Sequence, residues 1–173
     1  MRVIGLAGWS GAGKTTLLTR LIPCLLGRGI GVSTVKHAHH EFDVDRPGKD
    51  SWLHRQAGAQ QVLVGSARRW ALMTELRDAP EPGLGFLLAR LSPVDLVVVE
   101  GFKRDRHPKI EVHRAANDKP WLHPDDPAIR AVAADVPPPP GGRGLPFAAL
   151  DDIAGVADLA LRHAVDVEAL GVG

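Results

Sequence analysis

A glycine-rich stretch near the N-terminus, GWSGAGKTT at 8–16, constrains this chain more than any other feature. It fits the pattern G-x-x-x-x-G-K-[ST], with Gly8, Gly13, Lys14 and Thr15 at the defined positions. A short apolar run at 2–7 precedes it, and leucines and isoleucines at helical spacing follow it. Strand, glycine loop and helix in this order predict a phosphate-binding loop.

The chemistry of such a loop follows from its backbone. Glycines allow several N–H groups to point at one anion, and the helix N-terminus adds a partial positive charge. We expect Lys14 to reach the β- and γ-phosphates of a nucleotide and the Thr15 hydroxyl to bind Mg²⁺.

Length and charge narrow the class of protein. The 173 residues carry 21 basic and 20 acidic side chains and a single cysteine, Cys24. This balance gives no electrostatic reason to expect nucleic acid or a membrane surface as a partner. The apolar N-terminal run is interrupted by the glycine loop, and no apolar stretch reaches membrane-span length. We therefore expect a cytoplasmic protein with one domain over 1–173.

The rest of the chain alternates strand and helix patterns. Helices are predicted over 14–28, 50–57 and 84–91 and from 151 onward, and strands over 31–36, 61–65, 70–74, 94–100, 109–113 and 129–134. The strands at 61–65 and 70–74 read as a hairpin, and 109–113 alternates with one polar face. The prediction is a three-layer α/β fold: a mostly parallel sheet, helices on both faces and a β-hairpin or edge-strand extension. Residues 137–144 are expected to form a flexible loop and 171–173 a frayed tail.

Ligands of such folds bind at the carboxyl ends of the strands. Glu100 ends an apolar strand, where it could hold Mg²⁺ or orient an attacking water, or could simply face solvent. Gly101 would permit close backbone approach to a phosphate or metal. Asp135 follows a late strand and could accept hydrogen bonds from a guanine edge, although an acid at a strand end is common.

A polar cluster occupies the loop after the second strand, at His37, His39, His40, Glu41, Asp43 and Asp45. Its spacing matches no closed structural zinc site. Asp43 and Asp45 are the best candidates for magnesium binding or water positioning, and a transition-metal site at the histidines is the less favoured alternative. Basic residues in or beside the same loops could bind a second anionic ligand, or serve solubility alone: Lys36, Lys49, Arg55, Lys103, Arg104, Arg106 and Lys109.

Several motifs together resemble one known family. They are the loop at 8–16, VKHAHHEFDVDRPGKDS at 35–51, AGA at 57–59, DLVVVEGFK at 95–103 and PKIEV at 108–112. In this order they are similar to MobB, a P-loop NTPase family of molybdopterin-guanine dinucleotide biosynthesis. The resemblance covers about residues 2 to 135, and the proline-rich stretch 137–144 matches none of its motifs.

The resemblance implies a function as well as a fold. The family binds GTP, hydrolyses it weakly and acts as an adapter beside the guanylyltransferase of molybdenum cofactor maturation. It forms homodimers through the hairpin and edge region, and molybdopterin or its guanine dinucleotide is a possible ligand. By position, phosphate and Mg²⁺ would be held by Gly11, Ala12, Gly13, Lys14, Thr15 and Thr16. Glu100 and Gly101 would complete this site, and the loop from His37 to Asp50 would line it.

Two other functions use the same phosphate loop. A small-molecule kinase would hold its acceptor on the basic residues, and a metal-delivery GTPase would use the histidines at 37–40. If the chain is a GTPase adapter, we expect slow turnover, because no arginine finger is evident at a defined position, although Arg104 or Arg106 could serve.

Overall fold

The computed structural model describes residues 1–38, 42–140 and 143–171, which fall into two compact units. The larger unit consists of Met1–His37 and Leu84–Gly173, and the smaller unit is Ala38–Gly83. The expectations for His39, His40 and Glu41, and for parts of the 137–144 loop and of the tail, lie outside the described residues. The single domain over 1–173 stays a prediction.

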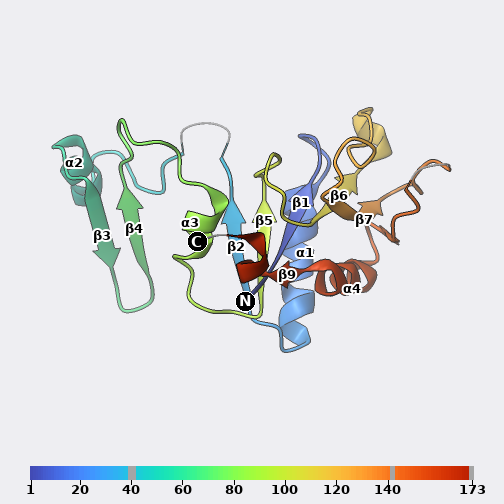
Figure 1. Ribbon diagram of the computed structural model, residues 1–173. Helices are drawn as coiled ribbons and strands as arrows, with labels where there is room; N and C mark the ends of the chain where they lie inside the picture. Colours follow the sequence, from blue (N-terminus) through green and yellow to red (C-terminus); the bar gives the residue numbers. More distant parts are fainter. Residues whose placement is uncertain (39–41, 141–142, 172–173) are drawn as a thin grey trace. The chain divides into compact units, whose positions relative to one another are not determined.

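The larger unit is built on a mainly parallel sheet (Figure 1). Its strand order is β2-β5-β1-β6-β7-β8, and every neighbouring pair along this path is parallel. The predicted α/β class is therefore confirmed. The strands are β1 (Arg2–Ala7), β2 (Val32–Lys36), β5 (Leu96–Glu100), β6 (Lys109–His113), β7 (Ile129–Ala134) and β8 (Phe147–Ala149).

Helices pack on both faces of this sheet, as predicted. Helices α1 (Lys14–Gly27) and α4 (Ile153–His163) share one apolar core with Ile4, Leu6, Val98, Ile110 and Val112 of the strands. The short α3 (Leu84–Leu88) and the 3-10 turn η2 (Val167–Leu170) pack against the alternate residues Val3, Val97 and Val99. Among the described residues, none of the helices has the length and hydropathy that a membrane span requires.

Strand β6 departs from the usual half-exposed alternating strand. The alternation is present, but all five residues are buried, including Lys109, Glu111 and His113. The apolar Ile110 and Val112 belong to the α1 and α4 core. The polar side is covered instead by the irregular residues 114–128, whose regular structure is one 3-10 turn, η1 (Ala115–Asn117).

Two short strands were not predicted. Strand β8 has three residues, and β9 (Val165–Asp166) has two, so neither carries a readable alternation. Strand β9 pairs antiparallel with Arg2 and Val3 at the start of β1, while β6 pairs with β1 only from Gly5 onward. It therefore fills the part of the β1 edge that β6 leaves open.

The smaller unit contains α2 (Asp50–Gln56) and the antiparallel hairpin of β3 (Gln61–Gly65) and β4 (Trp70–Thr74). The predicted hairpin is confirmed. Leu63 lies opposite Leu72, and Trp70 shares their face because it is two residues along the strand. These side chains are 65%, 49% and 70% exposed, so one face of the hairpin is apolar and uncovered by the described residues.

Candidate functional site

The loop between β1 and α1 has the backbone of an anion-binding turn. Gly13 directly precedes the helix with φ +91°, a left-handed conformation that a side chain would strain. The Ala12 N–H donates to the Trp9 carbonyl at 3.2 Å. Among the described residues no side chain caps the start of α1, and its first turn holds no acid. The helix N-terminus is therefore free to bind an anion through N–H groups and its dipole.

Lys14 curls back over this loop. Its half-buried ammonium group donates to the carbonyls of Gly8 at 2.9 Å and Trp9 at 3.0 Å. Burial lowers the pKa of Lys14, Glu100 counteracts this, and the charges of Lys103 and Lys36 lower it further. A phosphate at the loop would relieve the repulsion among these ammonium groups.

Thr15 and Glu100 meet at the edge of the sheet. The Thr15 hydroxyl donates to a carboxylate oxygen of Glu100 at 3.1 Å. Glu100 ends β5, which pairs with β1, so the parallel register brings its carboxylate to the start of α1. A hydroxyl and a carboxylate are both oxygen ligands that suit Mg²⁺. Two of the side chains that the sequence nominated for magnesium, Thr15 and Glu100, are thus brought together and fit that ion.

Gly101 forms a tight turn directly after Glu100. Its φ is +103°, and a side chain here would place a Cβ 2.5 Å from the Cβ of His37. The His37 N–H donates to the Glu100 carbonyl at 2.8 Å, and the imidazole lies 4.7 Å from the Phe102 ring, centroid to centroid. The close approach that demands glycine here is therefore to His37. Approach to a phosphate or metal stays a prediction.

The remaining predicted residues divide between the two units. Ala12 is buried and Thr16 is exposed at the start of α1. Asp135 follows β7, and one of its carboxylate oxygens accepts the Ala115 N–H at 2.8 Å. This bond ties down the segment that follows β6. Guanine recognition by Asp135 stays a prediction.

In the smaller unit, Asp43 and Asp45 surround the guanidinium of Arg55. Asp43 accepts two bonds from Arg55 at 2.8 and 2.7 Å, and Asp45 lies 3.4 Å from its Nε. The bonds to Arg55 lower the pKa of Asp43. Glu75 also accepts from Arg55, at 2.8 Å. These carboxylates therefore anchor their own unit, and their predicted role at magnesium stays a prediction. Among the described residues no group of three or more His, Cys, Asp or Glu side chains could hold a metal ion.

Two residues beside the phosphate loop were missed by sequence reasoning. The Asn117 amide donates to the Ser10 carbonyl at 2.9 Å. Arg114 lies so close to Gly13 that a Cβ there would be 3.4 Å from its Nη2. Both follow β6, the strand next to β1, at the carboxyl edge of the sheet. Their position after a strand that neighbours β1 is the signal that could have identified them. The sequence does not show which strands are neighbours in the sheet, so this signal was not available.

A parallel sheet with a phosphate loop between β1 and α1, and an acid at the end of β5, defines a P-loop NTPase fold. The particular family comes from comparison with known proteins. The family described as "MobB: Molybdopterin guanine dinucleotide synthesis protein B" matches residues 3–135. The chain belongs to the MobB family.

Relatives and solved structures agree with this assignment. The chain is 47% identical to the molybdopterin-guanine dinucleotide biosynthesis adapter protein of Escherichia coli (strain K12), over 92% of this chain and 91% of that protein. It is 46% identical to the adapter protein of Haemophilus influenzae (strain ATCC 51907 / DSM 11121 / KW20 / Rd), over 78% and 75%. A crystal structure of molybdopterin-guanine biosynthesis protein B is 28% identical, with a TM-score of 0.68 over 92% of this chain and 97% of that one.

Proposed function

We propose that this chain is an adapter of molybdopterin-guanine dinucleotide biosynthesis that binds GTP with Mg²⁺, hydrolyses it slowly and assists the guanylyltransferase. The observation that carries the nucleotide part is the Thr15–Glu100 pair, 3.1 Å apart beside the uncapped start of α1. The adapter role is supported by the near full-length similarity to the Escherichia coli adapter protein.

Different residues of the larger unit would bind the phosphates and Mg²⁺. The backbone N–H groups from Gly11 to Thr16 would surround the phosphates, and Lys14 would exchange its loop carbonyls for phosphate oxygens. Mg²⁺, when bound by the Thr15 hydroxyl and the Glu100 carboxylate, would neutralise charge on the phosphates. Arg114, beside Gly13, would add a second cation to the phosphate site.

The bond between Thr15 and Glu100 supports the proposal that GTP is hydrolysed slowly. Glu100 is bonded to Thr15, which favours metal positioning over activation of an attacking water. A site that holds nucleotide without rapid hydrolysis can keep a partner-binding state populated, which is what an adapter requires. Cytoplasmic location, with the guanylyltransferase and other cofactor-maturation proteins as partners and molybdopterin or its dinucleotide as a further ligand, belongs to the same proposal.

Calorimetric titration with GTP and with ATP, each with Mg²⁺, tests the nucleotide site. Lys14→Ala should abolish binding without unfolding the protein, because the main phosphate-binding cation is lost. Lys119→Ala removes an exposed charge outside the loop and should bind GTP normally. Unchanged GTP affinity in Lys14→Ala would refute the assignment of the phosphate loop.

Rapid phosphate transfer stimulated by an acceptor would show that the chain is a kinase and not an adapter. Asp43→Asn, titrated with GTP at varied Mg²⁺, tests its role at the metal.

The proposed function includes a homodimer formed through the hairpin of the smaller unit. An isolated two-stranded hairpin is marginally stable in water, and its face of Leu63, Trp70 and Leu72 is uncovered by the described residues. A second copy would cover this face. Light scattering after size exclusion should show a dimer that Trp70→Ser shifts to monomer, whereas Phe86→Ser, an exposed aromatic of α3, leaves it intact. A wild-type monomer at micromolar concentration would contradict the dimer.

A further inference from the structure

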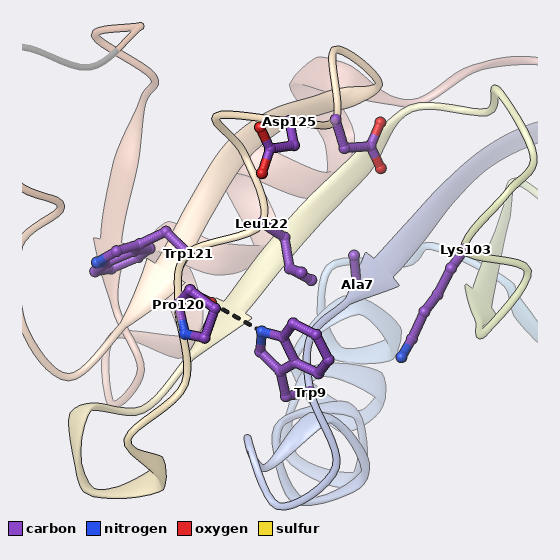
Figure 2. A pocket seen from close by; sticks show the side chains of 8 residues that line it. Ala7, Trp9, Lys103, Pro120, Trp121, Leu122 and Asp125 are labelled. Atoms are coloured by element: carbon purple, nitrogen blue, oxygen red, sulfur yellow. Dashed lines mark hydrogen bonds between the residues drawn. The ribbon is translucent and has the colours of Figure 1, made fainter.

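A small cavity opens beside the phosphate loop, within the larger unit (Figure 2). Its volume is about 250 Å³, slightly below the range of about 300–1,000 Å³ typical of pockets that bind whole small molecules. This size suits one ring system better than a complete nucleotide. The lining residues are Ala7, Trp9, Lys103, Pro120, Trp121, Leu122, Asp125 and Asp126.

One wall of the cavity is fixed by buried bonds. The carboxylate of Glu111 accepts the N–H groups of Leu122 at 2.6 Å and His123 at 2.9 Å, and contacts the His123 ring at 2.8 Å. The Trp121 ring stacks on His113, with centroids 3.7 Å apart. Glu111 and His113 lie on the buried polar side of β6, so their contacts hold this wall in place before any ligand binds.

The opposite side of the cavity is part of the phosphate loop itself. The indole N–H of Trp9 donates to the Pro120 carbonyl at 2.8 Å, which fixes the orientation of its ring (Figure 2). Ala7 and Leu122 lie between the indole and Asp125 in the same view. An apolar floor with a fixed aromatic ring is suited to a planar ligand, because such ligands stack.

Polar groups of opposite sign stand at the rim. The carboxylate of Asp126 already accepts hydrogen bonds from the Lys109 ammonium at 3.1 Å and from the Ala128 N–H at 2.8 Å. The carboxylate of Asp125, in contrast, accepts no hydrogen bond from any residue in the described part of the chain. Lys103 places its ammonium 5.5 Å from the Trp9 ring and also acts electrostatically on Lys14. The cavity thus offers an acceptor for N–H donors and a cation for a phosphate.

We propose that this cavity binds a planar 2-amino-4-oxopyrimidine ring, the edge that guanine and pterin share, on a ligand other than the nucleotide in the phosphate loop. The 2-amino group and the adjacent ring N–H would donate to the two oxygens of Asp125, while the ring face lies against Trp9. A phosphate on the same ligand would reach Lys103. This inference rests on the proposed function in one respect, that the phosphate loop holds its own nucleotide.

Calorimetry on the full chain, saturated with a non-hydrolysable GTP analogue and Mg²⁺, tests the ring preference. GMP and pterin are each titrated beside a matched ring that lacks the 2-amino group, IMP for GMP and lumazine for pterin. We expect GMP, pterin or both to bind, with the matched ring about tenfold weaker or worse, because a charge-assisted hydrogen bond is lost. The two arms identify whether a nucleotide or a pterin is the ligand. Equal binding of the matched rings, or no binding of either ring, would overturn the proposal.

Variants tie the preference to the cavity. Asp125→Asn should weaken the preferred ring about tenfold, and Lys103→Gln should weaken GMP but not uncharged pterin. Asp118→Asn, an exposed acid in the same segment, is the matched control and should bind like the wild type. Unchanged affinity in Asp125→Asn would overturn the proposal. Failure of the GTP analogue to bind would defeat the proposed function instead, and pterin titrated into the nucleotide-free protein would still decide the cavity.

Discussion

Strands β5 and β6 flank β1 on either side, and both are buried, yet they are buried by opposite means. Residues Leu96–Val99 of β5 are apolar on both faces and contact an apolar layer on each. Strand β6 is apolar toward α1 and α4 only, and its other face carries Lys109, Glu111 and His113. Where no helix packs on a sheet, an irregular segment held by polar side chains of the strand can cover it instead.

The polar face of β6 supplies directional bonds. Lys109 donates to the carbonyls of Lys103 and Asp105, and Glu111 holds Leu122 and His123. Apolar packing alone would not specify one conformation for the irregular residues 114–128, since it is not directional. Fully paired buried polar groups do specify one. The same segment carries Arg114 and Asn117 to the phosphate loop and Pro120 to Trp9, so the polar side of β6 positions the site.

The largest effect on stability is expected at Glu111, which bonds the irregular segment to β6. Glu111→Gln keeps the shape but replaces an acceptor oxygen by a donor N–H₂ facing buried N–H groups, so the free energy of unfolding should fall by about 3 kcal/mol. Urea unfolding measures this loss, and amide hydrogen exchange should rise at residues 121–123.

The matched variant lies on β5. Val98→Ala creates a small apolar cavity at a fully buried position and should lower the free energy of unfolding by about 2 kcal/mol, without changing amide exchange at 121–123. If exchange there rises equally in both variants, the two strands do not differ in the way inferred above.

A smaller effect is expected from His107, which packs on the same side of the sheet. A side chain on Gly5 would place its Cβ against the imidazole, and neither ring nitrogen has a partner among the described residues. Burial above all, together with the charge of Lys109 and partly opposed by Asp126, lowers the pKa of His107 to about 4. Between about pH 6.5 and 4 the unfolded chain therefore binds a proton that the folded chain does not, so stability falls as the pH falls.

His107→Leu removes this titration. From pH 7.5 to pH 5 the wild type should lose about 2 kcal/mol more unfolding free energy than the variant, as measured by urea unfolding at both pH values. A parallel pH dependence of the two proteins would show that His107 is not buried in its neutral form.

The smallest effect is expected at Trp9, where the segment held by β6 meets the phosphate loop. Trp9→Phe keeps an aromatic ring but removes the indole N–H bond to Pro120, so stability should fall by about 1 kcal/mol. GTP affinity should stay within a few-fold, since the loop backbone is unchanged. A large loss of GTP affinity with no loss of stability would place Trp9 in the nucleotide site instead of at the wall of the cavity.

Much of the fold was readable from the sequence because its signals are local. The glycine loop, the leucine spacing of α1 and the β-branched run of β5 each predict an element without reference to the rest of the chain. The hairpin of β3 and β4 was readable for the same reason. Strands β8 and β9 were not, because strands of three and two residues exist only through pairing with distant residues.

The candidate site divides in the same way. Lys14, Thr15 and Glu100 were nominated from motif and strand end alone. Arg114 and Asn117 were not, since nothing in their neighbourhood distinguishes them from other loop residues. Asp43 and Asp45 were nominated from composition, and the structure shows a structural partner, Arg55, that composition does not disclose.

Neighbouring residues alone are enough to predict the phosphate loop between a buried strand and a helix, since its signals are local. The surroundings of that loop come from residues that are distant in sequence and meet only in the folded sheet. The sheet order places β5 and β6 on either side of β1, which brings Glu100 to Thr15 and Arg114 to Gly13. The charged residues of β6 are buried beneath residues 114–128. Burial strengthens their hydrogen bonds, which hold that irregular segment against the phosphate loop.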